Sequence, residues 1–164
     1  MGLVEHVSST EPPWVELLIL PENKALETVA EKLDKFFIVM IDGPKCTTKG
    51  ELFSMFGKEF KFPSYFGNNW DAFEECINDL TWVSAKGYLV IITNAEHLLR
   101  NSENDYKVFV AIMQEAGFNW ANRKKPGEYR QAVPFHVLLT ISNKDKLALR
   151  EWGLPLMEPI RDGE

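Results

Sequence analysis

Three carboxylates lie in one short stretch of the sequence, residues 62–76, which reads FPSYFGNNWDAFEEC. Asp71 and Glu75 are four residues apart and Glu74 flanks them, so a helix would place all three on one side. No Lys or Arg occurs within the stretch to pair with them. Such a surface can bind a cationic partner through charge-assisted hydrogen bonds. Two carboxylates about 5 Å apart could also serve the hydrolysis of a glycosidic bond.

The residues before these acids indicate a tight turn that leads into the helix. Gly67 permits a positive φ, and Asn68 and Asn69 can bond to the turn backbone or cap the helix. The turn would hold Tyr65 and Phe66 near the first turn of an acidic helix, as aromatic anchors are held in protein interfaces. The alternative interpretation of the same residues is an ordinary solvated helix face.

The apolar spacing predicts that this helix starts at Asn68 or Asn69 and ends near Asp79. Its large apolar residues recur every three or four positions and form one stripe facing the core: Trp70, Phe73, Ile77 and Leu80. Asn78 lies beside the acids on the far side, and Cys76 points partly inward, where a buried thiol is inert.

The elements around this helix predict an α/β fold with a small three-stranded parallel sheet covered by helices. Thr48, with Glu51 three residues later, forms a capping-box pattern at the start of another helix. Residues 103–120 also have helical spacing. Three apolar runs read as strands buried on both faces: 36–42, 87–93 and 133–141.

The ends of the chain add an N-terminal strand and helix and a short C-terminal helix. A flexible leader precedes the N-terminal strand and helix, and Gly153 and Pro155 stop the C-terminal helix. The predicted segments are a leader at 1–13, a strand at 14–20, a helix at 24–36 and a helix at 143–153. We expect three parts: the N-terminal leader and extension (1–35), the α/β domain (36–141) and the C-terminal helix and tail (142–164).

Composition narrows the function classes. The chain has 164 residues, 45% hydrophobic and 26% charged, which suits a single globular domain. Its net charge of −6 disfavours a nucleic-acid binder and leaves room for a basic partner. Cys46 and Cys76 form no CxxC pair, which fits a reducing compartment. We find no signal-peptide pattern and no apolar run of about 20 residues, so we expect a cytoplasmic protein without membrane contact.

Other candidate sites are weaker. His136 lies inside an apolar strand and reads as a packed residue. His97 follows a strand, where α/β proteins can bind ligands, yet no nucleophile or metal-ligand spacing accompanies it. No nucleotide-binding, nucleophile-elbow or zinc-protease motif occurs, so we predict no enzyme, cofactor or metal site. A basic cluster reads as a solvated loop or as a contact to RNA or to an acidic patch: Arg123, Lys124, Lys125 and Arg130.

The turn and helix together resemble the signature of the barstar family of intracellular ribonuclease inhibitors. The matching residues are Pro63, Tyr65, Phe66, Gly67, Asn69, Asp71, Ala72, Glu75 and Cys76. The resemblance extends over roughly residues 36–141, through the order of strands and helices. Three contact positions depart from the family pattern. Glu75 replaces an aspartate, Glu74 replaces a tryptophan, and a glutamate of the later helix aligns near Ala111, with Glu115 as its candidate substitute.

The resemblance implies that the second helix and the preceding loop block a ribonuclease, with acidic groups where RNA phosphates would lie. It implies a 1:1 heterodimer with a basic ribonuclease toxin, in which this chain is the immunity protein. No direct nucleic-acid contact, small-molecule substrate or cofactor is implied. The implied partner-binding residues are Tyr65, Phe66, Gly67, Asn68, Asn69, Asp71, Glu74, Glu75 and Asn78. A second hypothesis keeps this fold as an interaction module with a non-nuclease partner.

Overall fold

The computed structural model describes residues 2–22, 24–64, 66–123 and 131–157, and within them the chain forms a parallel four-stranded sheet. The strand order is β1-β4-β3-β2. The strands are β1 (Val15–Ile19), β2 (Phe36–Asp42), β3 (Gly87–Thr93) and β4 (Phe135–Ile141). The predicted α/β class with a parallel sheet and an N-terminal strand and helix is confirmed, and the N-terminal strand joins the sheet as its fourth member.

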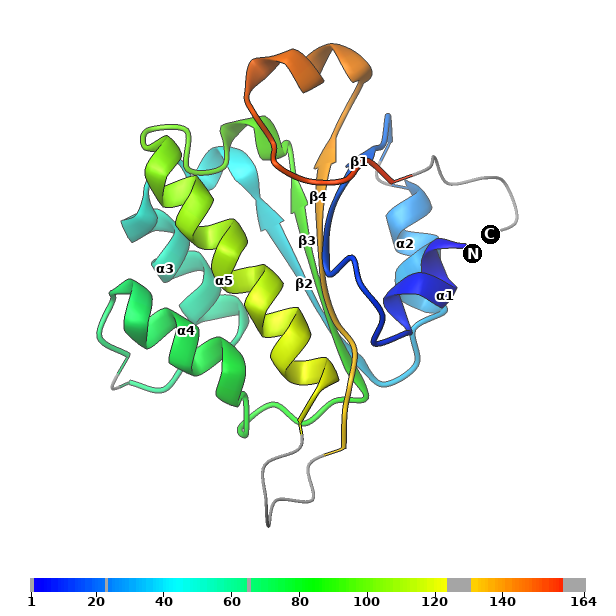
Figure 1. Cartoon of the computed structure of the whole chain (residues 1–164), viewed down its shortest axis with the longest axis vertical. Coiled ribbons are helices and arrows are strands. Elements are labelled where there is room, and N and C mark those ends of the chain that lie inside the picture. Colours follow the sequence, from blue (N-terminus) through cyan, green and yellow to red (C-terminus); the bar gives the residue numbers. More distant parts are fainter. Residues whose placement is uncertain (1, 23, 65, 124–130, 158–164) are drawn as a thin grey trace.

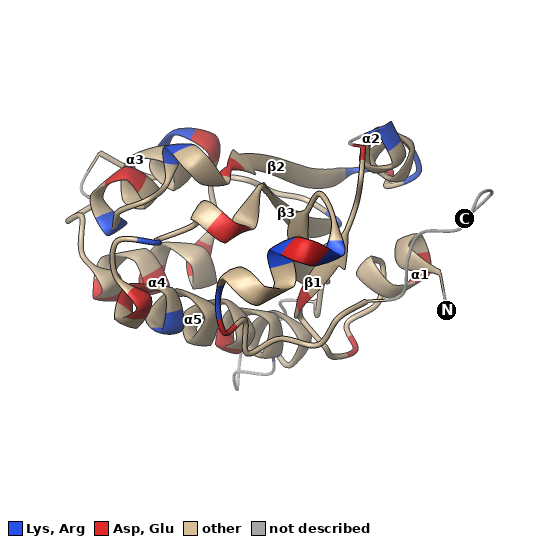
Figure 2. Ribbon diagram, turned by 90° about the horizontal axis from the view of Figure 1, so that it is seen from above, with Lys and Arg blue, Asp and Glu red and all other residues tan. Residues whose placement is uncertain are grey.

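Helices cover both faces of the sheet, as parallel strands require. Figures 1 and 2 show three helices on one side, namely α3 (Lys49–Glu59), α4 (Trp70–Asp79) and α5 (Glu103–Ala121). The shorter helices α1 (Leu3–Val7) and α2 (Lys24–Glu31) lie on the other side. Three short 3-10 helices complete the described elements: η1 (Gly43–Lys45), η2 (Ala95–His97) and η3 (Lys144–Leu149).

A cluster of phenylalanine rings fixes α4 on the larger core. Phe56 of α3 lies with its ring centroid 5.2 Å from that of Phe73 on α4. Phe73 in turn lies 6.2 Å from Phe109 on α5. All three residues are fully buried, and aromatic pairs at these separations stabilise the contact beyond simple area burial. The acidic helix is therefore held between its two neighbours by its inner face.

The N-terminal residues dock on the sheet, so the expected flexible leader is wrong for residues 3–7. These residues form α1, in which Leu3 and Val7 are buried. β1 follows and pairs with β4, with Val15 opposite Val137. An amphipathic segment can bury its apolar side only against a partner surface. Here α1 packs on the face of the sheet opposite α3, α4 and α5. The three-part division of the chain stays a prediction.

The C-terminal residues cover the outer edge of β1. The backbone N–H of Leu17 donates to the Pro155 carbonyl (2.9 Å), and the N–H of Met157 donates to the Leu17 carbonyl (2.7 Å). These bonds satisfy edge groups that would otherwise be open to pairing with another chain. In place of the α-helix predicted at 143–153, the short η3 forms, and its N-cap Asn143 accepts from the Asp145 N–H at 3.0 Å.

Candidate functional site

The turn before α4 is held by hydrogen bonds of its own backbone and of Asn69. The Phe66 N–H donates to the Pro63 carbonyl (3.0 Å). The Asn69 side-chain oxygen accepts from the Ala72 N–H (2.8 Å), which makes Asn69 the N-cap, one of the two candidates that the sequence left open. Its amide nitrogen donates back to the Gly67 carbonyl at 3.4 Å. The start of the acidic helix is thus fixed on both sides of the cap.

The left-handed backbone conformation of this turn falls on Asn68, and the expectation that placed it on Gly67 is wrong. Asn68 has φ 54°, a region that asparagine tolerates better than most residues. Gly67 serves close approach instead, since a Cβ there would lie 3.2 Å from the Asn69 side-chain nitrogen. Any side chain at position 67 would press on the cap.

Phe66 packs into the core and anchors the turn. Its ring lies 5.0 Å from that of Phe62 and 5.8 Å from that of Phe53, both in edge-to-face geometry. The residue is half-buried, so its main effect is to fix the turn against α3. Tyr65, the other predicted aromatic contact, lies outside the described residues.

The apolar stripe of α4 faces the core, as the spacing of its residues predicted. Phe73 and Ile77 are fully buried, and Leu80 after the helix is 1% exposed. Trp70 packs edge-on against Phe53, and its indole N–H donates to an Asp105 carboxylate oxygen on α5 (3.4 Å). Burial raises the pKa of the Cys76 thiol on the same face, which keeps it neutral and unreactive.

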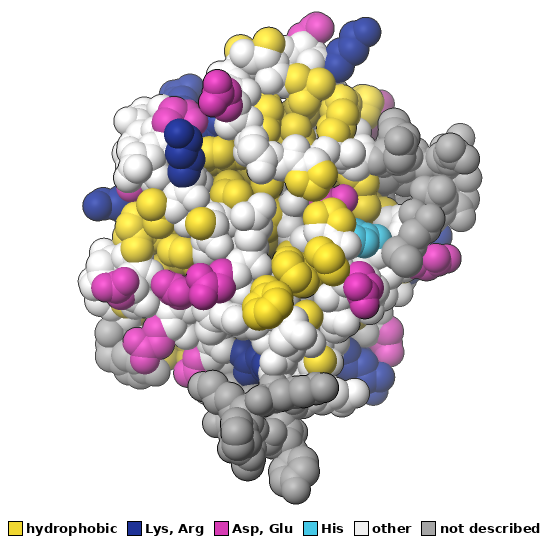
Figure 3. Space-filling model, in the orientation of Figure 1, with side chains coloured by type: hydrophobic (Ala, Val, Ile, Leu, Met, Phe, Trp, Pro, Cys, Tyr) yellow, Lys and Arg dark blue, Asp and Glu magenta, His cyan; other side chains and the backbone are white. Residues whose placement is uncertain are grey.

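The outer face of α4 carries a row of carboxylates. Asp71 and Glu75 are exposed, Glu74 is partly exposed, and Asp79 continues the row one turn beyond Glu75. We call these four residues the acidic surface. Within the described part of the chain, none of them forms an ion pair. Acidic side chains gather over α4 and the adjoining turns of α5 in the lower left of Figure 3.

Asp79 was missed as a site residue, although its signal is present in the sequence. It stands four residues after Glu75 and eight after Asp71, the spacing that keeps side chains on one helix face. On α5, the exposed Glu115 adds a further acid to the same side of the sheet. The carboxylate row is therefore longer than the three predicted acids.

Asn78 is engaged within the molecule. Its side-chain nitrogen donates to the Glu74 carbonyl (2.8 Å), and its side-chain oxygen accepts from the Asn119 amide of α5 (3.1 Å). Its backbone carbonyl accepts from the guanidinium of Arg123, which also stacks over the Trp120 ring. These contacts join α4 to α5. Lys124, Lys125 and Arg130 of the basic cluster lie outside the described residues.

The alternative candidate sites gain no support. His97 lies in η2, with its Nδ1 atom 2.9 Å from the Arg100 guanidinium. No group of three metal-binding side chains occurs in the part of the chain that the structure describes. Two surface hollows, of about 480 and 410 Å³, are lined by residues of η1 and α3 and by residues around the start of β2. Neither hollow is lined by Asp71 or Glu75.

The fold and the acidic surface define an α/β protein that presents a rigid anionic helix. The sequence profile of Barstar (barnase inhibitor) matches residues 36–139, and the chain belongs to the barstar family. That match covers β2, β3, most of β4 and the whole of α4, which confirms the resemblance drawn from the sequence. Proteins of this family are inhibitors rather than enzymes.

Further comparisons add little to this assignment. No curated protein matches the chain. A solved structure titled "Structure of Drosophila ORC bound to AT-rich DNA and Cdc6" contains a similar chain with 11% sequence identity and a TM-score of 0.49. The similarity covers 92% of the present chain and 46% of that chain. Among the described residues, no helix is both long and apolar enough to cross a membrane.

Proposed function

We propose that this chain inhibits a basic ribonuclease by binding it one-to-one through the acidic surface and the turn that precedes it. The observation that carries the proposal is the row of exposed and partly exposed carboxylates, without ion pairs among the described residues, on a helix whose other face is packed into the core. Membership of a family of ribonuclease inhibitors supports the same partner class. In this proposal the chain is the immunity protein to a ribonuclease toxin.

The chemistry of a ribonuclease active site explains why such a surface would fit. An enzyme that binds RNA must hold phosphates, and Lys and Arg side chains do so through charge-assisted hydrogen bonds. Asp71 and Glu75 offer carboxylate oxygens to the same donors. Because α4 is capped by Asn69 and packed by Phe73, little backbone conformational entropy is lost when the carboxylates are bound. The acidic charge would also steer a basic enzyme towards this face.

We propose different roles in partner binding for the nine predicted contact residues. Asp71, Glu74 and Glu75 would bind cationic groups of the ribonuclease, and Asp79 would extend the contact. Gly67, Asn68 and Asn69 would present the turn backbone. Phe66 and Asn78 would support the surface from behind, and Tyr65 keeps its predicted role as an aromatic contact. The two free thiols, Cys46 and Cys76, fit action in the reducing cytoplasm.

A calorimetric titration against small basic ribonucleases, with barnase among them, tests the proposal. We expect one-to-one binding to at least one enzyme, weakened by the double replacement Asp71→Ala with Glu75→Ala. A matched control removes two acids elsewhere, Glu31→Ala with Asp34→Ala, both exposed near the end of α2. Equal affinity of the two double variants would exclude the acidic surface as the binding site.

A second candidate is a barstar-fold interaction module whose basic partner is not a nuclease. Glu74 and Glu75 favour it, because both depart from the family pattern at the centre of the surface. A glutamate reaches one methylene further than an aspartate and would require a deeper pocket on the partner. Retention of a basic protein other than a ribonuclease, with loss in the Asp71→Ala and Glu75→Ala variant, would support this candidate.

A further inference from the structure

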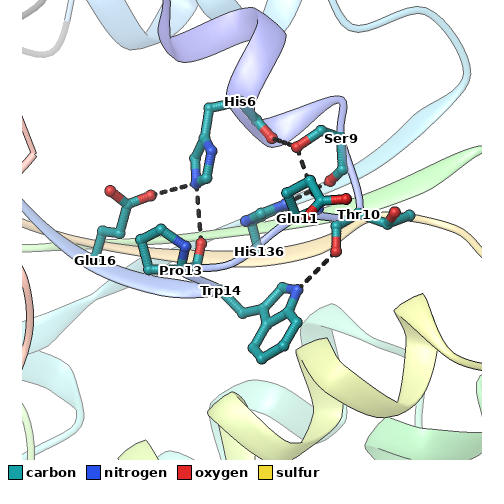
Figure 4. Close-up of polar contacts among 8 residues, drawn as sticks. All are labelled: His6, Ser9, Thr10, Glu11, Pro13, Trp14, Glu16 and His136. Atoms are coloured by element: carbon teal, nitrogen blue, oxygen red, sulfur yellow. Dashed lines mark hydrogen bonds and ion pairs between the residues drawn. The ribbon is translucent and has the colours of Figure 1, made fainter. Parts of the chain in front are cut away.

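A second group of titratable residues lies on the face of the sheet opposite the acidic surface. His6 of α1, Glu16 of β1 and His136 of β4 come together there, with 8%, 6% and 1% of their surfaces exposed. We call them the histidine cluster, and Figure 4 shows the two histidine rings close to each other beside the sheet, where they meet edge to face. The cluster is the side-chain polar contact that joins α1, and with it the N-terminal segment (residues 2–14), to the sheet within the described residues, beside the backbone bond from the Val137 N–H to the Trp14 carbonyl.

His6 ties α1 to the first strand. Its Nε2 atom lies 2.6 Å from a carboxylate oxygen of Glu16 and 2.9 Å from the Pro13 carbonyl. The Pro13 carbonyl can only accept a hydrogen bond, so Nε2 carries a hydrogen. The Glu16 oxygen is buried without a hydrogen-bond partner among the described residues and meets His6 as an ion pair. A buried carboxylate is costly unless it is paired, and a protonated His6 supplies the compensating charge. The pair is therefore best satisfied when His6 is an imidazolium.

His136 is held in the neutral state by its geometry. Its Nε2 atom lies 2.7 Å from the Ser9 carbonyl, which only accepts, so Nε2 carries the hydrogen. Its Nδ1 atom is buried and has no hydrogen-bond partner among the described residues. A proton on Nδ1 would thus add a buried charge without an acceptor. The ring centroids of His136 and His6 lie only 4.8 Å apart, so that charge would also face an imidazolium.

We propose that the histidine cluster is a pH-dependent clasp that docks the N-terminal segment when His6 is charged and His136 is neutral. One carboxylate, Glu16, neutralises one imidazolium. At acid pH, protonation of His136 places a second positive charge beside His6 and releases the N-terminal segment. At alkaline pH, deprotonation of His6 removes the charge that pairs with Glu16 and weakens the docking of the segment. Docking is therefore tightest near neutral pH.

Among the described residues, no charged side chain outside the cluster pairs with either histidine ring. Glu16 is the carboxylate from β1, and each ring faces the other from α1 and β4. Glu5 of α1 and Glu11 of the following loop are exposed, and neither pairs with a ring in the described residues. The two rings titrate as a coupled pair because they are in contact.

The pKa directions agree with this assignment. The close contact with the Glu16 carboxylate and its negative charge raise the pKa of His6 above its ordinary 6.5 against the opposing effect of burial. The stability from His6 is then present below 6.5 and lost as pH rises through the raised value. Burial lowers the pKa of His136. Its contribution is present above 6.5 and lost as pH falls towards the lowered value. Together the two histidines give a docking stability that passes through a maximum as the pH is raised.

Amide hydrogen exchange of the full chain between pH 5.5 and 8.5, corrected for the intrinsic rate, tests the clasp. We expect the protection of residues 3–9 to peak near neutral pH and to fall on the acid side by up to about tenfold per pH unit. A smaller loss is expected on the alkaline side, where neutral His6 can still donate. Constant protection, or a steady change in one direction over the whole range, would overturn the proposal.

Two variants separate the cluster from a general pH effect. His136→Gln keeps a side-chain N–H for the Ser9 carbonyl but cannot become charged, so the acid-side loss should disappear. His97→Gln, a matched control in η2, should keep the full profile. Retention of the acid-side loss in a folded His136→Gln variant would contradict the clasp. If that variant does not fold, ring-proton NMR of the unmodified chain decides: one buried histidine must titrate above 6.5 and one below it.

Discussion

Glu16 and Glu75 have the same side chain, yet the fold treats them in opposite ways. Glu16 is 6% exposed and lies 2.6 Å from a histidine nitrogen. Glu75 is exposed on α4 and forms no ion pair within the described residues. An internal ion pair with His6 compensates the charge of the Glu16 carboxylate and joins it to the N-terminal segment. The Glu75 carboxylate keeps its bonding capacity for another molecule.

The two regions also differ in what fixes them. The acidic surface rests on an apolar inner face, so removing a carboxylate leaves the core intact. The histidine cluster is itself part of the interior, so removing one member leaves a buried polar group without its partner. We therefore expect changes at the acidic surface to alter binding and changes at the cluster to alter folding. The following predictions test that separation, from the largest expected effect to the smallest.

The double replacement Asp71→Ala with Glu75→Ala should have the largest effect, on binding alone. Central anchors of an interface cost about 2 kcal/mol or more each, so affinity for the ribonuclease should fall by about 4 kcal/mol. The free energy of unfolding should change by less than about 0.5 kcal/mol, as for most surface positions. Calorimetric titration and urea unfolding measure the two quantities on the same samples. A large loss of folding stability in the double variant would contradict the separation between the acidic surface and the histidine cluster.

Glu16→Ala should act in the opposite way. We expect a loss of about 2 kcal/mol in the free energy of unfolding, less than for a fixed buried charge, because His6 can release its proton. Ribonuclease affinity should be unchanged, since Glu16 lies on the far face of the sheet. Urea unfolding at pH 7 measures the loss, with Glu75→Ala as the control. Equal destabilisation by the two single variants would contradict the prediction.

Gly117→Ala tests how closely the N-terminal segment packs on α5. A Cβ at Gly117 would collide with the Trp14 side chain, and overpacking of this kind costs typically about 1–3 kcal/mol. After the gain in helix propensity of about 1 kcal/mol, a net loss of about 1 kcal/mol remains. Gly57→Ala on α3 is the control, because its Cβ would meet nothing closer than 3.8 Å. It should stabilise the protein, and thermal unfolding should give shifts of opposite sign.

Asn69→Ala should give the smallest change, because it removes one cap. We expect a loss of about 1 kcal/mol in folding stability and a modest loss of affinity as the turn loosens. Asn69→Asp keeps an acceptor for the Ala72 N–H and should retain stability. Chemical denaturation of both variants measures the difference. If Asn69→Asp were as unstable as Asn69→Ala, the cap would not be what holds the start of α4.

Much of the barstar-like region was predictable because its elements are strongly patterned. The spacing of Phe73 and Ile77 located the inner face of α4, and Thr48 with Glu51 located the start of α3, where both capping-box bonds form. These signals depend on residues close together in the sequence, and the structure contains both predicted features. The acidic row was also predicted from spacing, except for Asp79, which lies one turn beyond Glu75, the last of the three acids considered.

The remaining features depend on contacts between residues far apart in sequence. His6 and His136 are 130 positions apart, and no pattern in either segment indicates that they meet. The place of β1 beside β4 likewise depends on which edge of the sheet is free. Asn78 illustrates the same limit at the site, because its engagement with Asn119 depends on how α5 packs. Local periodicity cannot supply any of these pairings.

Steady-state kinetics of RNA cleavage by a ribonuclease that binds this chain tests the central claim most directly. If the carboxylates of the acidic surface occupy the positions of RNA phosphates, inhibition should be competitive. The apparent KM should rise with inhibitor concentration while kcat stays constant, and the Asp71→Ala with Glu75→Ala variant should leave both unchanged. A fall in kcat at constant KM, or equal inhibition by the double variant, would show that the acidic surface does not block the active site.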